Sequence, residues 1–196
     1  MLNSDQMDIS IKYSNLKNLE IKPTLFFEFH GTENSNKEHI EVVESLSFNN
    51  LGSKFKWAET NEERNKLWKA RHDVYYSVKS QKNDARVYTT DVCVPISKLV
   101  ECIKFVEIEV QKYGLKAPMV GHVGDGNFHT TFLYDPSKKE DYDLIRTFCN
   151  KLIEKALELD GTITGEHGVG IHKKEYLIKQ HGDNIPIMRS IKNTLD

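Results

Sequence analysis

The 196-residue sequence predicts an α+β domain, in which an antiparallel sheet carries helices packed on one face. Three observations support this fold class. Short apolar strands alternate with amphipathic helical stretches, Asp125-Gly126 predicts a tight hairpin, and no GxGxxG sequence opens a helix. The last two favour an antiparallel sheet over a doubly wound parallel one. A chain of this length forms one domain, or one domain with a short appendage.

The first part of the chain has few regular patterns. Residues 1–22 are polar and weakly patterned, so we expect a ragged N-terminal lead-in. Thr60 and Glu63 form a capping box, in which the two side chains can satisfy backbone amides at a helix start. The expected elements are a strand over 24–29, a helix over 37–48, a strand in which Phe55 and Trp57 alternate with Lys54 and Lys56, and a helix from Thr60 to Val78.

In the second part of the chain, proline, serine and glycine residues mark where the expected strands and helices begin and end. Pro95 stops a strand, Ser97 can cap the next helix, and Gly161 follows the end of a long amphipathic helix. The expected elements are a strand over 91–95, a helix from 97 to 114, strands over 117–123 and 128–134, a helix over 139–159, and one or two C-terminal helices.

Composition excludes several classes of function. With 27 basic and 29 acidic side chains, the net charge of -2 argues against nucleic-acid binding. No apolar run approaches the roughly 18–20 residues that a membrane span requires. The first eight residues do not resemble a targeting peptide. Three scattered cysteines without a CxxC pair argue against a disulfide framework or a thiolate zinc site.

Most of the glycines gather in two windows, 121–126 and 161–170, and the first window begins the sequence Gly-His-Val-Gly-Asp-Gly-Asn-Phe-His. A two-residue turn at Asp125-Gly126 would place His122 directly opposite His129, with Cβ atoms about 4.5–5.5 Å apart. Two imidazoles held in this way can share a divalent metal ion. The alternative is a hairpin whose histidines are ordinary surface residues.

The second window contains Glu166 and His167 between glycines. Such a loop lets Glu166 reach a metal while His167 points at whatever the metal holds. Two histidines and one carboxylate form a three-ligand site with open positions, as a catalytic metal requires. The alternative is a helix C-cap followed by a flexible loop, which explains the glycines but not the Glu-His pair.

Both windows resemble the substrate-binding half of the flavin-linked D-2-hydroxy-acid dehydrogenases, which are flavoproteins of the vanillyl-alcohol oxidase type. Segments 25–31, 67–72 and 89–97 extend the resemblance over almost the whole chain. The Thr-Asp-Val-Cys-Val-Pro sequence at 90–95 favours the mitochondrial, cytochrome-linked D-lactate branch over the glycolate and 2-hydroxyglutarate branches.

The resemblance implies a ferredoxin-like cap domain that works with a separate FAD-binding domain, in cis or in trans. It implies a divalent metal, zinc or manganese, held by His122, His129 and Glu166, with His167 as the catalytic base. It also implies that Arg71 grips the substrate carboxylate, although a solvated helix arginine is the alternative. D-lactate as substrate, cytochrome c as electron acceptor and a mitochondrial location follow from the same resemblance.

The chain departs from the family pattern in three places. His172 stands where the family usually has glycine, the N-terminal FAD-binding domain is missing, and residues 23–196 read as a cap domain truncated at its C-terminus. We therefore expect the chain purified by itself to be colourless and unable to oxidise D-lactate, as an absorption spectrum and a turnover assay would show; a yellow, active preparation would contradict this. A catalytically inactive remnant and a His-His-Glu metallohydrolase remain the alternatives.

Overall fold

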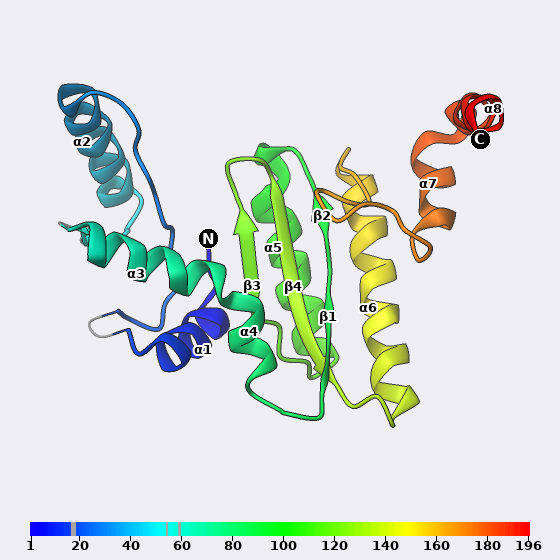
Figure 1. Cartoon of the computed structure of the whole chain (residues 1–196), viewed down its shortest axis with the longest axis horizontal. Coiled ribbons are helices and arrows are strands. Elements are labelled where there is room, and N and C mark those ends of the chain that lie inside the picture. The colour runs from blue at the N-terminus through cyan, green and yellow to red at the C-terminus, as the bar shows by residue number, and fades with distance from the viewer. Residues whose placement is uncertain (17–18, 54, 59) are drawn as a thin grey trace. The chain divides into compact units, whose positions relative to one another are not determined.

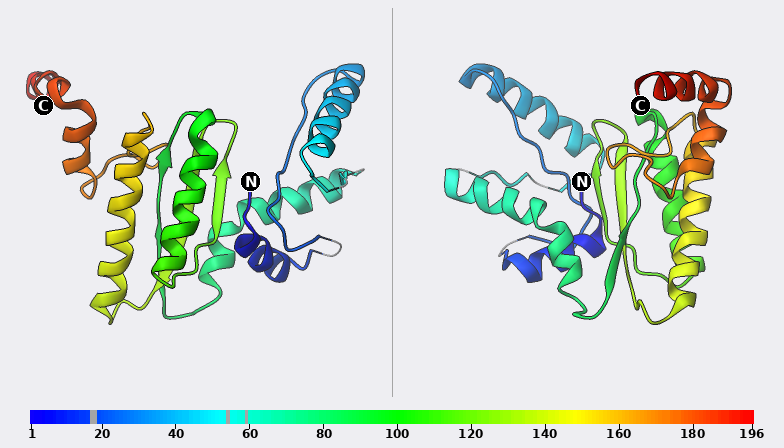
Figure 2. Two further views of the ribbon diagram at one scale, coloured as in Figure 1. Left: turned by 180° about the vertical axis from the view of Figure 1, so that it is seen from behind. Right: turned by 45° about the vertical axis from the view of Figure 1, so that its right-hand side comes forward.

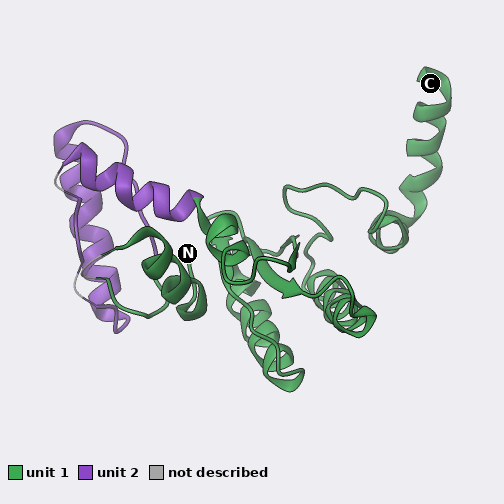
Figure 3. Ribbon diagram, turned by 60° about the horizontal axis from the view of Figure 1, so that its bottom comes forward, with its two compact units in different colours: residues 1–24, 73–196 green, residues 25–72 purple. Residues whose placement is uncertain are grey.

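The computed structural model describes residues 1–16, 19–53, 55–58 and 60–196, and the chain divides into two compact units. Unit 1 comprises residues 1–24 and 73–196, and unit 2 comprises residues 25–72 (Figure 3). The sequence predicts one domain that begins at residue 23, whereas the first 24 residues belong to the same unit as the sheet. Across the described ranges, no helix combines the length and the apolar character that crossing a bilayer requires.

The antiparallel sheet of unit 1 is organised around its longest strand, β4, which pairs with each of the other strands. β3 pairs with residues 127–130 of β4, β2 with 127 and 128, and β1 with 131–134. The strands are β1 (Arg86–Thr89), β2 (Val92–Cys93), β3 (Met119–His122) and β4 (Asn127–Tyr134). The sequence does not predict β1, because no clear signal separates its residues from the polar link that precedes them.

Two long helices cover one face of this sheet, α5 (Ile96–Lys112) and α6 (Lys139–Glu158), as Figures 1 and 2 show from opposite sides. The α+β fold class is therefore confirmed. The core lies between these helices and the sheet, where the rings of Phe132 and Phe148 meet edge to face at 5.1 Å. Phe128 and Phe132 of β4 both enter this core, so His129 between them points to the opposite face of the sheet.

The expected N-terminal lead-in is wrong, because residues 4–14 form helix α1 (Ser4–Ser14). The Asn3 side chain accepts a hydrogen bond from the Gln6 amide and so caps this helix. Its buried side is polar around Met7: the buried Gln6 amide group donates to the hydroxyls of Ser10 and Ser77 at 3.0 and 3.1 Å. Apolar periodicity cannot reveal a helix whose buried side is satisfied by hydrogen bonds of this kind.

The remaining helices of unit 1 are α4 (Val74–Lys79), α7 (Lys174–His181), α8 (Ile185–Leu195) and a short 3-10 turn over Gly182–Asn184. α4 lies against β1 and β4 on the face opposite to α5 and α6 (Figure 2). Helix α5 begins at Ile96 with Pro95 as its N-cap, so Ser97 does not cap it as predicted. The long helix and the C-terminal helices agree with the prediction.

Unit 2 contains α2 (Glu33–Asn49) and α3 (Asn61–His72). The capping box is confirmed: the Thr60 hydroxyl accepts from the Glu63 amide, and the Glu63 carboxylate accepts from the Thr60 amide, each at 3.2 Å. The helix predicted to reach Val78 is interrupted at Asp73, where α4 begins anew.

Among the described residues before α3, neither predicted strand forms. Thr24 makes one isolated bridge with Leu2, and residues 25–30 have no regular secondary structure. The Phe27 ring packs instead on the rings of Phe29 and Phe55, so these aromatic side chains cover one another rather than a sheet. Phe55 and Trp57 also lie outside any strand, and Lys54 falls outside the described residues.

The hairpin between β3 and β4 turns at Gly126, whose φ is +76° and whose added Cβ would lie 1.9 Å from the Val94 carbonyl oxygen. Gly114 has a similar φ of +64° but open space around it, and it therefore serves as a matched control. We expect Gly114→Ala to lower the free energy of unfolding by about 1–2 kcal/mol, from the left-handed backbone alone. Gly126→Ala should cost about 1–3 kcal/mol more, because the backbone must also move. Urea denaturation of both variants measures this difference, and equal losses would refute the close packing of the turn.

Candidate metal centre

The first part of the site is the β3–β4 hairpin, and its register differs from the predicted one. His122 pairs with Asn127 and Val120 pairs with His129, so the turn spans 123–126 rather than two residues. The difference in register is two residues. Because side chains alternate with a period of two, His122 and His129 still share one face, as diagonal neighbours. Their ring centroids lie 6.4 Å apart.

The second part is the glycine-rich loop that follows α6. Thr162 extends the sheet through an isolated bridge with Cys93, in which the Thr162 amide donates to the Cys93 carbonyl at 2.7 Å. Beyond it, the backbone amides of Gly165, Glu166 and His167 all donate to the Asp91 carboxylate. This loop is thereby held next to the start of β4, where the hairpin histidines lie.

The two glycine-rich windows meet at His129. Its Nε2 atom lies 2.7 Å from Oε1 of Glu166, and its ring stacks on that of His167 with centroids 4.7 Å apart. His122, His129 and Glu166 each offer one ligand atom, and these three atoms lie within 4.8 Å of one another. A divalent ion with bonds of about 2.0–2.2 Å to nitrogen and oxygen can therefore be reached by all three with small side-chain adjustments.

The buried imidazole of His129 is prepared to act as a ligand. Its side chain is 6% exposed, and Nδ1 lies 3.0 Å from the Thr90 carbonyl oxygen, which can only accept. Nδ1 therefore carries the proton, and Nε2 presents a lone pair. Burial lowers the pKa of His129, which favours the neutral ring that metal binding needs. Glu166 Oε1 lies 2.7 Å from the buried Nε2, but no hydrogen bond joins Nε2 to any described residue, and a metal ion held by both atoms would satisfy them.

The other two members of this group are open to solvent. The Glu166 side chain is 49% exposed, and His122 is also exposed. His167, at 50% exposure, has its Nε2 atom 3.7 Å from Glu166 Oε1. With one side chain buried and two exposed, the outer side of this group is accessible to a small molecule, and the His167 imidazole borders that side.

Of the five predicted site residues, four come together: His122, His129, Glu166 and His167. The fifth, Arg71, lies in the last turn of α3 within unit 2, so the structure by itself does not join it to the histidines. Asp91 is the site residue that the sequence did not reveal. Burial would raise its pKa, but hydrogen bonds from the Thr164 hydroxyl and from the loop amides outweigh this and hold the pKa well below the usual range.

The whole chain, residues 1–196, matches the family described as FAD linked oxidases, C-terminal domain. The chain belongs to this family. As an FAD-linked oxidase C-terminal domain, it has an open antiparallel sheet flanked by helices, in keeping with the family assignment.

Relatives of this FAD-linked oxidase domain include several named enzymes. A protein of Danio rerio named probable D-lactate dehydrogenase, mitochondrial, is 40% identical over 186 residues, which cover 94% of this chain and 37% of that protein. D-lactate dehydrogenase (cytochrome), mitochondrial, of Arabidopsis thaliana is 39% identical over 194 residues, covering 98% and 34%. A glycolate oxidase subunit of Bacillus subtilis is 31% identical over 176 residues, covering 89% and 37%. The chain thus spans about a third of the length of these relatives.

Proposed function

We propose that this chain is the substrate- and metal-binding part of an FAD-dependent D-lactate dehydrogenase, which oxidises D-lactate to pyruvate by hydride transfer to the flavin. The observation that carries the proposal is the convergence of His122, His129 and Glu166 beside an exposed His167. The D-lactate dehydrogenases among the relatives, at 39–40% identity for the two described above, point to the same substrate.

His122, His129 and Glu166 are the proposed ligands of a divalent ion, zinc or manganese. Nitrogen and oxygen donors suit either ion. A bound ion would supply charge that lowers the pKa of a coordinated hydroxyl group, and the FAD of the flavin-binding domain would supply the hydride acceptor. The protein residues orient the substrate and move its proton.

His167 is the proposed base. Its imidazole stacks on the buried His129 ring, and half of its surface is exposed, so a substrate hydroxyl can approach Nε2. A neutral imidazole presents one ring nitrogen with a free lone pair, which can accept a proton from a hydroxyl group within hydrogen-bond distance. Arg71 is the proposed partner of the substrate carboxylate, because a guanidinium group presents a planar, permanently charged fork.

The proposal also names partners and a location. The FAD is bound by a flavin-binding domain, joined to this chain in cis or supplied in trans. Cytochrome c is the proposed electron acceptor, because the name of the Arabidopsis thaliana relative includes the word cytochrome. A mitochondrial location is proposed because both names include the word mitochondrial.

Flavin reduction tests the proposal directly. With the FAD-binding domain of a D-lactate dehydrogenase relative supplied, we expect D-lactate to bleach the flavin absorbance. A chelator should abolish the bleaching, and added Zn²⁺ or Mn²⁺ should restore it. The measurement is stopped-flow absorbance with D-lactate, L-lactate and glycolate in parallel. Glycolate is the second candidate substrate, because a glycolate oxidase subunit is among the relatives. Faster bleaching by glycolate than by D-lactate would reassign the substrate, and bleaching insensitive to the chelator would refute the metal.

A further inference from the structure

Asp91 has an unusual environment for a buried carboxylate. Its side chain is 1% exposed, and it lies between β1 and β2, facing the glycine-rich loop. The oxygen Oδ2 accepts from the Thr164 hydroxyl at 2.5 Å and from the amides of Gly165, Glu166 and His167 at 2.9, 3.1 and 2.9 Å. Oδ1 accepts from the Asn127 side-chain amide at 2.8 Å. One carboxylate therefore gathers donors from the loop and from the start of β4.

Three consecutive backbone amides that point at one anion form a nest, a backbone conformation that a negative charge stabilises. Here the anion is part of the protein, and the amides belong to the residues that carry the loop's two proposed functional side chains. When the backbone of Glu166 and His167 is fixed, the positions and directions of their Cα–Cβ bonds are fixed as well. This arrangement places the Glu166 carboxylate and the His167 ring against His129.

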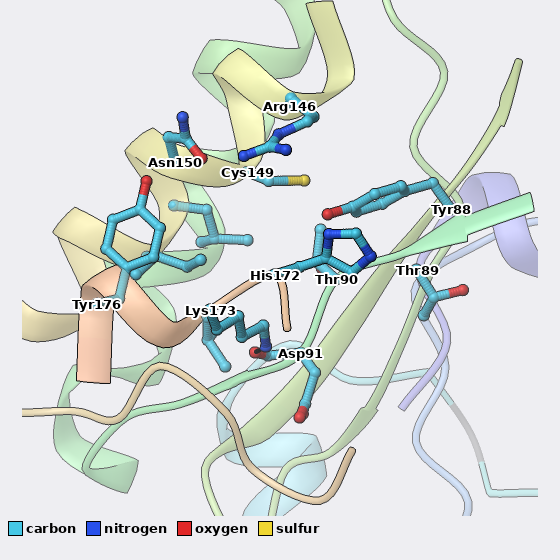
Figure 4. Close-up of a pocket in the computed structure, with 13 residues that line it drawn as sticks. Tyr88, Thr89, Thr90, Asp91, Arg146, Cys149, Asn150, His172, Lys173 and Tyr176 are labelled. Carbon is cyan, nitrogen blue, oxygen red and sulfur yellow. Dashed lines mark hydrogen bonds between the residues drawn. The ribbon is translucent and has the colours of Figure 1, made fainter. Parts of the chain in front are cut away.

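Lys173 holds the same loop from its other end. Its ammonium group donates to the carbonyl oxygens of Asp91 and Ile163, at 2.8 and 2.7 Å. Figure 4 shows the Lys173 side chain reaching from the loop towards Asp91, below the ring of His172. The lysine thus joins the strand junction at Asp91 to the residue that precedes the loop, and its charge partly balances the carboxylate.

The contacts also decide between two possible ligand groups. Asp91, His129 and His167 offer a second set of ligand atoms within 4.8 Å of one another. Because the oxygens of Asp91 already accept from the loop and from Asn127, coordination of a metal would take acceptor capacity from these donors. Coordination by His122, His129 and Glu166 would leave the hydrogen bonds to Asp91 in place.

We propose that Asp91 is a positioning residue, whose carboxylate preforms the 164–167 loop so that Glu166 can bind the metal and His167 can meet the substrate. This inference rests on the proposed metal site. It assigns to Asp91 no contact with the metal or the substrate.

Four variants of the 196-residue chain test the inference: Asp91→Ala, Asp91→Asn, Thr164→Val and, as control, Asp143→Asn. Asp143 lies exposed on α6, so Asp143→Asn removes one negative charge, as Asp91→Asn does, but at a position away from the loop. Thr164→Val removes one donor hydroxyl and little volume, and keeps the test decisive if Asp91→Ala does not fold. The readouts are hydrogen exchange of the amides of 165–167 without metal, the affinity for Zn²⁺ by calorimetry, and the absorption spectrum of bound Co²⁺, which reports coordination geometry.

We expect the three amides to exchange at least about tenfold faster in Asp91→Ala, with Asp91→Asn intermediate because one acceptor remains. Zinc affinity should fall by about 10–100-fold, which is the usual loss when a residue that orients a metal ligand is removed. The absorption spectrum of bound Co²⁺ should change as well. Thr164→Val should show the same changes to a smaller extent, and Asp143→Asn none. Unchanged exchange and zinc affinity in Asp91→Ala and Thr164→Val would overturn the positioning role. A wild-type chain that binds no Zn²⁺, with exchange still dependent on Asp91, would instead overturn the proposed function.

Discussion

Replacing His129 by alanine should lower the affinity of the chain for Zn²⁺ by more than about 100-fold. Removing a residue that only orients a metal ligand already lowers metal affinity by about 10–100-fold, and removing a ligand should cost more. His129 is the buried member of the proposed ligand set. Its Nε2 lone pair is oriented by the Nδ1 contact with the Thr90 carbonyl, an arrangement that no exposed histidine could replace after the substitution. Calorimetric titration with Zn²⁺ and Mn²⁺ measures the loss.

His181→Ala is the matched control. His181 ends α7, and it belongs to neither group of possible ligands found in the described part of the chain. We expect zinc affinity in this variant to equal that of the wild type. If His129→Ala bound Zn²⁺ as tightly as His181→Ala does, the ion would be held elsewhere, and the assignment of the site would be wrong.

Replacing His167 by alanine should slow flavin reduction by D-lactate by about 10²–10⁴-fold, the usual contribution of a general base. Zinc affinity should stay within a few-fold of the wild type, because His167 is not among the three proposed ligands. This split between rate and metal affinity separates a base from a ligand. It is measured by stopped-flow absorbance with the FAD-binding domain supplied, alongside calorimetry of the chain.

His172→Ala provides the control for this variant, since His172 is exposed and lies five residues further along the same segment. It should reduce the flavin at the wild-type rate. Added imidazole should partly restore the rate of His167→Ala, because a free base can enter the space left by the ring. Wild-type rates in His167→Ala, or an equal loss of rate in His172→Ala, would exclude His167 as the base.

The hairpin shows how far sequence reasoning could reach. The Asp125-Gly126 signal located the turn correctly, but the loop has four residues instead of two. Gly126 packs against the carbonyl of Val94 and adopts positive φ, so contacts with the residue that follows β2, distant in sequence, help to set the loop length. The two histidines nevertheless share a face, because the error in register was an even number of residues.

Elements whose stability depends on polar contacts were missed. Helix α1 buries Gln6 and Ser10 beside Met7, and the Gln6 amide group donates to the hydroxyls of Ser10 and Ser77, so no continuous apolar stripe marks it. Strand β1 is held by its pairing with residues 131–134 of β4, about 45 residues further along the chain. Propensity within a short window contains no information on such pairings.

The sequence predicts four side chains that the structure brings together, but it does not predict the residue that supports them. His122, His129, Glu166 and His167 carry a recognisable pattern of residue types and spacing. Asp91 has no local signal, because the loop donors that hold it are 73–76 residues away. A single acidic residue before a strand reads as a solvated side chain until the fold brings the loop to it.

X-ray absorption of the zinc-loaded chain is the most direct test of the central claim, that the two glycine-rich windows supply one metal centre. We predict a first shell of nitrogen and oxygen at about 2.0–2.2 Å, with the outer scattering of two imidazole rings, and the loss of one ring in His122→Ala. A sulfur neighbour at about 2.3 Å, or a shell without imidazole, would contradict the account.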